Sequence, residues 1–260
     1  MNAKLLLLVI IFLVFPKQEI YSQFGFSHEI GVIAGPLALY SDFGQRNDVE
    51  TNSGNSTIGF GLIHYINFSY RSDCNCYTAD TFFNDHFKLR NEIDYHSTTL
   101  EQHGKWVASD QQGDSADYLR SIQGSTTVFE IGSQLEYFPL SIRDFAASTG
   151  KLAPFISAGL HWVAYDPSVN YDEALGIASN YYGGKYNPAT SMDNQGGNTW
   201  SIVGSVGVRY KLTTLSDLML DSRWGYYFSN WVDGLNPDVT ENKANEWLYW
   251  INIGYIYYLE

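Results

Sequence analysis

Residues 247–260 read WLYWINIGYIYYLE, an aromatic segment that alternates at period two. One face carries only apolar or aromatic side chains, namely Trp247, Tyr249, Ile251, Ile253, Tyr255 and Tyr257. The other face is mixed, because it contains Asn252 and Gly254 beside Trp250 and Ile256. A β-strand in a bilayer exposes an apolar face to acyl chains and places Trp and Tyr at the interfaces. The segment therefore predicts a transmembrane β-strand.

Seven earlier segments alternate in the same manner and are longer than the roughly five or six residues of most globular strands. They are His28–Leu39, Thr57–Arg71, Asp85–Leu100, Ile122–Phe138, Leu152–Tyr165, Thr199–Lys211 and Asp217–Phe228. With the last segment they make eight, an even number and the smallest size known for outer-membrane barrels. The sequence therefore predicts an all-β fold: a single eight-stranded antiparallel transmembrane β-barrel, an OmpA-like up-and-down meander.

The composition agrees with a barrel that has one apolar face, one polar face and hydrophilic loops. Aromatic residues make up 16% of the 260 residues and charged residues only 17%. The mean hydropathy is −0.21. The net charge of −13 argues against a nucleic-acid partner, because such proteins carry basic surfaces.

The first 22 residues have the pattern of a signal peptide. Lys4 precedes an apolar run, Leu5–Phe15, and the more polar segment Pro16–Ser22 follows it. The run is shorter than the roughly 20 residues that a membrane-spanning helix needs. We expect cleavage after Ser22, export to the outer membrane with a periplasmic N-terminus, and one barrel domain over residues 23–260 surrounded by outer-membrane lipid.

Charged side chains gather on the second face of several predicted strands. A polar interior accepts such a face and an apolar core does not. An eight-stranded barrel is only wide enough for its own side chains to fill. The predicted inward set contains both signs: Lys88, Arg90, Glu92, Asp94, Glu130, Glu136, Arg209, Lys211, Asp217, Asp221 and Arg223. We expect an interior lattice of ion pairs and hydrogen bonds rather than an open pore. The reading in which these charges solvate a lumen stays open.

The connections between strands divide into two sets, one on each side of the membrane. The outer set is rich in Asn, Asp and Gly and comprises Tyr40–Ser56, Glu101–Ser121, Asp166–Asn198 and Ser229–Glu246. Two of the three periplasmic connections, Ser72–Asn84 and Pro139–Lys151, are longer than the short turns usual there. Two enlarged turns on one side suggest a docking surface, with Arg143, Asp144 and Phe145 as candidate contacts for a periplasmic partner.

The cysteines, Cys74 and Cys76, are separated by a single residue. A disulfide across one residue is strained, and a lone Cys-x-Cys pair supplies too few ligands for structural zinc. Whether the two are bonded stays open, and no cofactor or metal is predicted.

The stretch FEIGSQLEYFPLSIRDFAASTGKLAPFISAGLHWVAYDP follows Val128, and HEIG occurs at His28–Gly31. These motifs resemble the PorG-like family of small Bacteroidota outer-membrane barrels, in which a Glu-Phe/Tyr-x-Phe strand end precedes an enlarged turn, Pro-Tyr/Phe, Gly and Tyr-Asp-Pro. The matching residues here are Glu136, Tyr137, Pro139, Pro154, Phe155, Gly159, Tyr165, Asp166 and Pro167. The resemblance implies an anchor of the type IX secretion and gliding machinery that touches periplasmic ring lipoproteins.

Three other functions remain in view. Some eight-stranded barrels deacylate lipid A with a Ser and a His, but His96 and Ser97 are adjacent and so face opposite sides of a strand. We therefore expect no enzyme. A secreted lipocalin-like barrel would need the apolar faces inside. A structural or adhesin-type barrel would bind its partner through the outer loops.

Overall fold

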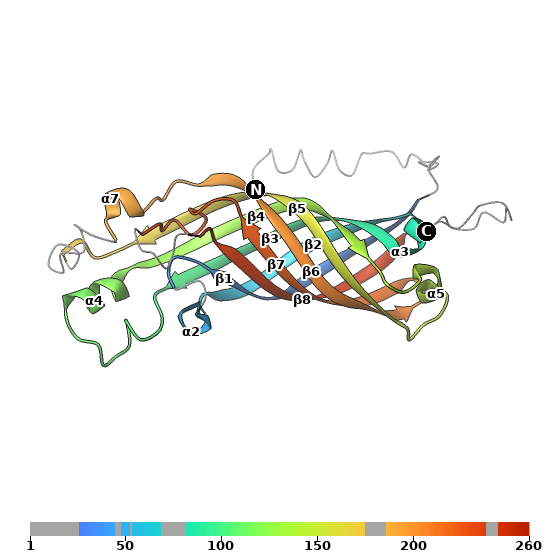
Figure 1. The fold of residues 1–260 in the computed structure, drawn as a ribbon, viewed down its shortest axis with the longest axis horizontal. Coiled ribbons are helices and arrows are strands. Elements are labelled where there is room, and N and C mark those ends of the chain that lie inside the picture. The colour runs from blue at the N-terminus through green and yellow to red at the C-terminus, as the bar shows by residue number, and fades with distance from the viewer. Residues whose placement is uncertain are drawn as a thin grey trace, which may run out of the picture.

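Eight antiparallel strands close into one barrel in the computed structural model, which describes residues 26–44, 48–52, 54–68, 82–174, 186–237 and 244–259 (Figure 1). The strands neighbour one another in chain order, and the last pairs with the first. Their bounds are β1 Ser27–Tyr40, β2 Ser56–Asn67, β3 Phe87–Glu101, β4 Gln123–Tyr137, β5 Leu152–Asn170, β6 Gly197–Thr213, β7 Ser216–Tyr227 and β8 Trp247–Leu259. The predicted eight-stranded antiparallel barrel is confirmed.

Most strand ends lie within two residues of the prediction, and three of the differences have a structural reason or a limit worth stating. The third strand begins at Phe87, because Asp85 and His86 belong to the short helix α3, Phe82–His86. The fifth strand continues to Asn170, since its pairing with β4 runs through Tyr165 as far as Gln123. The second strand ends at Asn67, and residues 69–71 of the predicted segment lie outside the described residues.

The outward face of the barrel forms a belt of exposed apolar side chains. On β2 the outward residues Ile58, Phe60 and Leu62 are each more than half exposed, and Ile253 on β8 is 65% exposed. Aromatic residues flank the belt on both sides. Toward one rim they include Tyr95, Trp200 and Trp224, and toward the other Tyr137, Tyr210 and Tyr257. An apolar belt with aromatic borders is the surface of a barrel that faces hydrocarbon.

Inward side chains fill the barrel, and two inward glycines leave room for large polar neighbours. A Cβ added at Gly132 would lie 2.2 Å from Cδ2 of His161. One added at Gly61 would lie 2.1 Å from a carboxylate oxygen of Asp94. The absence of side chains at these two positions is therefore a packing requirement of the charged interior.

Short helices occupy both ends of the barrel (Figure 1). The helices α2, α4 and α7 lie at one end, which we call the α4 end, while α3 and α5 lie at the other, the α5 end. Their bounds are α2 Val49–Asn52, α4 Asp114–Ser121, α5 Ile142–Ala146 and α7 Pro188–Ser191. No helix in the described part of the chain is long and apolar enough to cross a membrane.

Candidate functional site

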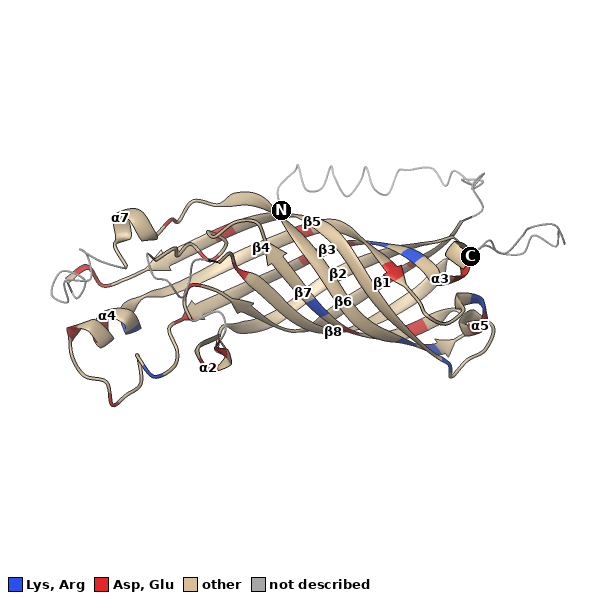
Figure 2. Ribbon diagram, in the orientation of Figure 1, with Lys and Arg blue, Asp and Glu red and all other residues tan. Residues whose placement is uncertain are grey.

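Ion pairs link the strands across the barrel interior near the α5 end. Glu29 lies 2.6 Å from Lys88 Nζ and 2.6 Å from Arg209 Nη2. Arg209 also contacts Asp217 at 2.7 Å, and Asp217 in turn lies 3.2 Å from Lys211. The chain of charges therefore joins β1, β3, β6 and β7. Figure 2 shows basic and acidic positions on the strands toward the end that carries α3 and α5.

A second group of ion pairs occupies the middle of the barrel around two arginines. Arg90 contacts Glu136 at 2.9 Å and Asp221 at 3.2 Å. Arg223 contacts Glu92 at 2.7 Å and Asp94 at 2.9 Å. Because Asp221 also lies 3.5 Å from Arg223, and Glu92 lies 3.4 Å from Arg90, the two arginines share two carboxylates and form a single network.

The central network continues toward the α4 end through a histidine. His161 lies between two carboxylates, with Nε2 2.8 Å from Glu92 and Nδ1 3.0 Å from Glu130. The hydroxyl of Tyr227 donates to Glu130 at 2.7 Å. Tyr65 connects this network to the first, because its hydroxyl donates to Glu136 at 3.0 Å and its ring lies 4.8 Å from the Arg209 guanidinium.

The structure places all eleven charged residues of the predicted inward set inside the barrel, each in at least one ion pair. The sequence reasoning missed Glu29 and His161. Glu29 alternates with small and apolar residues on β1, and His161 lies on the least polar strand. The signal that could have found them is the period-two position, which places both on the inward face.

The barrel is closed at the α4 end by a segment that folds back into its mouth. Within residues 230–236, which we call the plug segment, Val232 and Leu235 are fully buried. Thr126 Oγ1 donates to the carbonyl oxygen of Val232 at 2.6 Å, and the backbone N–H of Asp42 donates to Asp233 Oδ2 at 2.7 Å. Val232 and Leu235 belong to the buried apolar cluster of the barrel, which also contains Leu39, Phe43, Leu100, Val128 and Val169.

The helix α4 at this end also packs inward. Tyr118 of α4 is buried, and its hydroxyl donates to the carbonyl oxygen of Tyr186 at 3.1 Å. Burial raises the pKa of Tyr118 to about 12. The Tyr118 hydroxyl therefore stays protonated, and its hydrogen bond links α4 to the backbone of Tyr186.

The α5 end is closed by aromatic side chains, and one predicted contact residue is among them. Phe145 is 4% exposed and covers Lys211, whose Nζ lies 5.6 Å from the ring centroid. Phe138 is buried with its ring centroid 5.7 Å from Lys88 Nζ, and the Tyr258 ring centroid lies 3.6 Å from Lys211 Nζ. Phe145, a candidate partner contact by sequence, is therefore buried in the barrel end and not exposed on its surface. Ile142 and Phe145 form the apolar face of α5 and pack into the barrel end.

The two enlarged connections at this end are joined into one unit, which we call the platform, formed by α3 and α5. Asp85 Oδ1 accepts from Ser141 Oγ at 3.0 Å and from the backbone N–H of Arg143 at 3.1 Å. Arg143 is half-buried and Asp144 is exposed on the platform surface. Most of the Ser72–Asn84 connection, with Cys74 and Cys76, lies outside the described residues, as does the predicted signal peptide.

In the described part of the chain, two groups of buried side chains have the spacing to hold a metal ion. Glu92, Asp94 and His161 each bring one ligand atom within 4.8 Å of the others, and so do Asp42, Asp233 and Glu246. The first group is already engaged by Arg223, which contacts both of its carboxylates. The group of Glu92, Asp94 and His161 is therefore part of the ion-pair network.

The candidate Ser–His pair is separated by the wall of the barrel. His96 points inward, where Nδ1 lies 3.1 Å from Thr98 Oγ1. Ser97 points outward and lies 3.2 Å from Thr127 Oγ1. The two side chains therefore do not form a nucleophile and base.

Comparisons with known proteins return solved structures only. No family model matches the chain, and no curated protein is similar to it. Neisserial surface protein A is 14% identical over 88% of this chain and 96% of its own, with a TM-score of 0.40. OprG from Pseudomonas aeruginosa is 12% identical over 89% and 97%, with a TM-score of 0.42. Ail of Yersinia pestis, solved with a heparin analogue, is 9% identical over 90% and 99%, with a TM-score of 0.40.

Proposed function

We propose that this protein is a sealed, non-enzymatic outer-membrane barrel that anchors a periplasmic component of a cell-envelope assembly. The observation that carries the proposal is the combination of an exposed apolar belt with a charged interior closed at both ends. A secreted ligand-binding barrel has the opposite polarity, with apolar side chains lining its cavity. The observed polarity favours the membrane barrel.

The filled interior supports an anchoring role over transport. The large charged side chains Arg90, Arg209 and Arg223 are almost completely buried and bridged to carboxylates. A conducting barrel needs a continuous aqueous lumen, and this barrel width is already taken up by side chains. The membrane location and the platform are then the two features with which the protein can act.

The platform is the surface proposed to bind the partner. Antiparallel pairing of β1 and β8 brings Ser27 and Leu259 to the α5 end, which we assign to the periplasm. The hydrogen bonds from Ser141 and Arg143 to Asp85 hold α3 and α5 together, so that a partner meets one preformed surface. By the PorG-like resemblance, the partner proposed is a ring lipoprotein of the type IX secretion and gliding machinery.

The test is recovery of partners from detergent-solubilised outer membranes with a tagged protein, followed by mass spectrometry. We expect periplasmic lipoproteins with the unmodified protein and their loss with the Arg143→Ala/Asp144→Ala double variant. The matched control is Lys105→Ala/Asp110→Ala, two exposed charges in the connection at the α4 end. Equal recovery with both double variants would rule out the platform as the contact surface.

A second candidate function is binding through the outer loops, and the strand lengths favour it. Beyond the apolar belt, β3, β4 and β5 continue with outward polar residues such as Thr99, Ser125 and Ser168. These strand ends and α4 build a folded surface above the membrane. Exchange of residues 102–122 for a short turn separates the two functions, because it removes outer binding and leaves the platform intact.

A further inference from the structure

A row of four hydrogen-bonded polar side chains crosses the outward face of the barrel. Ser133 Oγ donates to Asn91 Oδ1 at 2.7 Å, and Asn91 Nδ2 lies 3.3 Å from His64 Nδ1. His64 Nε2 lies 3.1 Å from His28 Nδ1, and the two imidazole rings are stacked. We call these four residues, from β4, β3, β2 and β1, the polar row.

The polar row lies within the apolar belt. Ser133 is flanked along β4 by Ile131 and Leu135, and Asn91 is followed along β3 by Ile93, all three more than 40% exposed. Polar groups at such depth are costly unless they are hydrogen-bonded, and they commonly mark functional positions. The mutual bonds offset most of that cost but leave the two ends of the row to be satisfied by something outside the barrel.

The direction of the row follows from the chemistry of its members. An amide nitrogen can only donate, so His64 Nδ1 accepts from Asn91 and His64 carries its proton on Nε2. His64 therefore donates to His28 Nδ1, and His28 carries its proton on Nε2. The row ends with this N–H donor near the start of β1, at the periplasmic rim.

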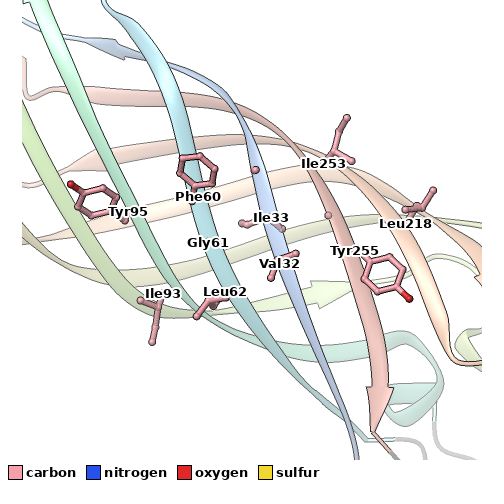
Figure 3. Close-up of a pocket in the computed structure, with 12 residues that line it drawn as sticks. Val32, Ile33, Phe60, Gly61, Leu62, Ile93, Tyr95, Leu218, Ile253 and Tyr255 are labelled. Atoms are coloured by element: carbon pink, nitrogen blue, oxygen red, sulfur yellow. The ribbon is translucent and has the colours of Figure 1, made fainter. Parts of the chain in front are cut away.

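A groove runs along β1 beside the polar row, and Figure 3 shows residues that line one part of it. Its floor is formed by the small outward residues Val32 and Ala34, and its walls by Phe60 and Leu62 on β2 and by Ile253 and Tyr255 on β8. The part of the groove toward the α4 end has a volume of about 550 Å³. The part toward the α5 end, which His64, Asn91 and Ser133 border, has a volume of about 740 Å³. Both parts share Val32, Leu62 and Tyr255, so they form one continuous groove.

We propose that this groove binds a phospholipid of the periplasmic leaflet, with one acyl chain along β1 and a headgroup phosphate oxygen accepting from His28. The proposal rests on the membrane location proposed above. The lining of the groove is mainly apolar, and the polar row beside it presents the His28 N–H at the rim, where the phosphate of that leaflet lies. A second barrel docked at this face would instead have to fill a concave wall along its whole height.

The experiment uses the full-length barrel in phosphatidylethanolamine vesicles that contain a trace of the same lipid with a photoreactive acyl chain. After illumination, labelled peptides are mapped by mass spectrometry. We expect several-fold more label on β1 and β8 than on the outward residues of β5 and β6. Ala34→Trp fills the groove and abolishes the excess, whereas Ala158→Trp, an exposed alanine on β5, leaves it unchanged.

A second variant tests the headgroup contact. His28→Leu removes the terminal donor, and we expect a several-fold loss of labelling by the phospholipid but not by a photoreactive hydrocarbon without a phosphate. Even labelling around the barrel overturns the lipid site, and so does a dimer in the same vesicles that Ala34→Trp dissociates. A protein that never inserts, judged by the absence of a heat-dependent gel shift, overturns the membrane location itself.

Discussion

Single residues in the central network carry charge that only their neighbours balance. Arg223 is 2% exposed and contacts Glu92, Asp94 and Asp221. Arg223→Met removes the cation and leaves three carboxylates together, so we expect the free energy of unfolding to fall by about 3–5 kcal/mol. Urea titration in detergent micelles measures this change. Adding Asp94→Asn should restore part of the loss, and a double variant no more stable than the single one would contradict the pairing.

Interior glycines make a second prediction at this scale. Gly132→Ala would place a methyl group 2.2 Å from His161 and 2.3 Å from the carbonyl oxygen of Leu160. We expect a loss of about 1–3 kcal/mol in unfolding free energy, as for an overpacked core. Gly225→Ala is the matched control, because the nearest atom to its added methyl lies 3.6 Å away, on Leu248. Equal stability of the two variants would show that β4 and β5 can shift apart at no cost.

Residue chemistry also decides how much of the site could be predicted. Alternation identified the inward carboxylates and cations of β3, β6 and β7, because charge on an alternate face is visible in one strand. Glu29 and His161 were missed because each is an isolated polar residue among apolar ones, and only pairing with other strands supplies its partners. The burial of Phe145 could not be predicted, because a loop residue reveals its burial only when the helix that carries it is seen.

At the scale of elements, one hydrogen-bonded side chain holds the platform together. Asp85→Ala removes the acceptor for Ser141 Oγ and for the Arg143 N–H. We expect faster amide hydrogen exchange over residues 138–151 with the strands unchanged, since local opening depends on local contacts. Asp144→Ala, which removes an exposed carboxylate from the same helix, is the control. Unchanged exchange in both variants would mean that α5 is held by Phe145 and Ile142 alone.

The same aspartate explains an error in the predicted element bounds. Asp85 and His86 continue the alternation of β3, and the sequence pattern therefore extended the strand over them. In the structure, Asp85 binds the backbone of α5 and His86 Nδ1 lies 2.7 Å from the Phe138 carbonyl oxygen. Contacts between two connections ended the strand, and no local pattern reports such contacts.

For the whole molecule, the plug segment and the filled interior together predict a barrel that does not conduct ions. The plug segment covers one end, but the ion-pair networks fill the interior beneath it. We expect no steady conductance in planar bilayers, either for the intact protein or after residues 230–236 are replaced by a short glycine-rich turn. Stable channel currents from the shortened protein would show that the plug segment alone seals the barrel.

The pairing of β1 with β8 has a consequence for chain connectivity. His28 lies opposite Leu259, so the two ends of the barrel wall are as close as any two adjacent strands. The wall is therefore continuous between β8 and β1, so that the chain could in principle begin at a different strand and keep every strand pair. A short linker from β8 to β1, with new termini at residues 214–215 on the same side, would give a circular permutant that keeps all eight strand pairs.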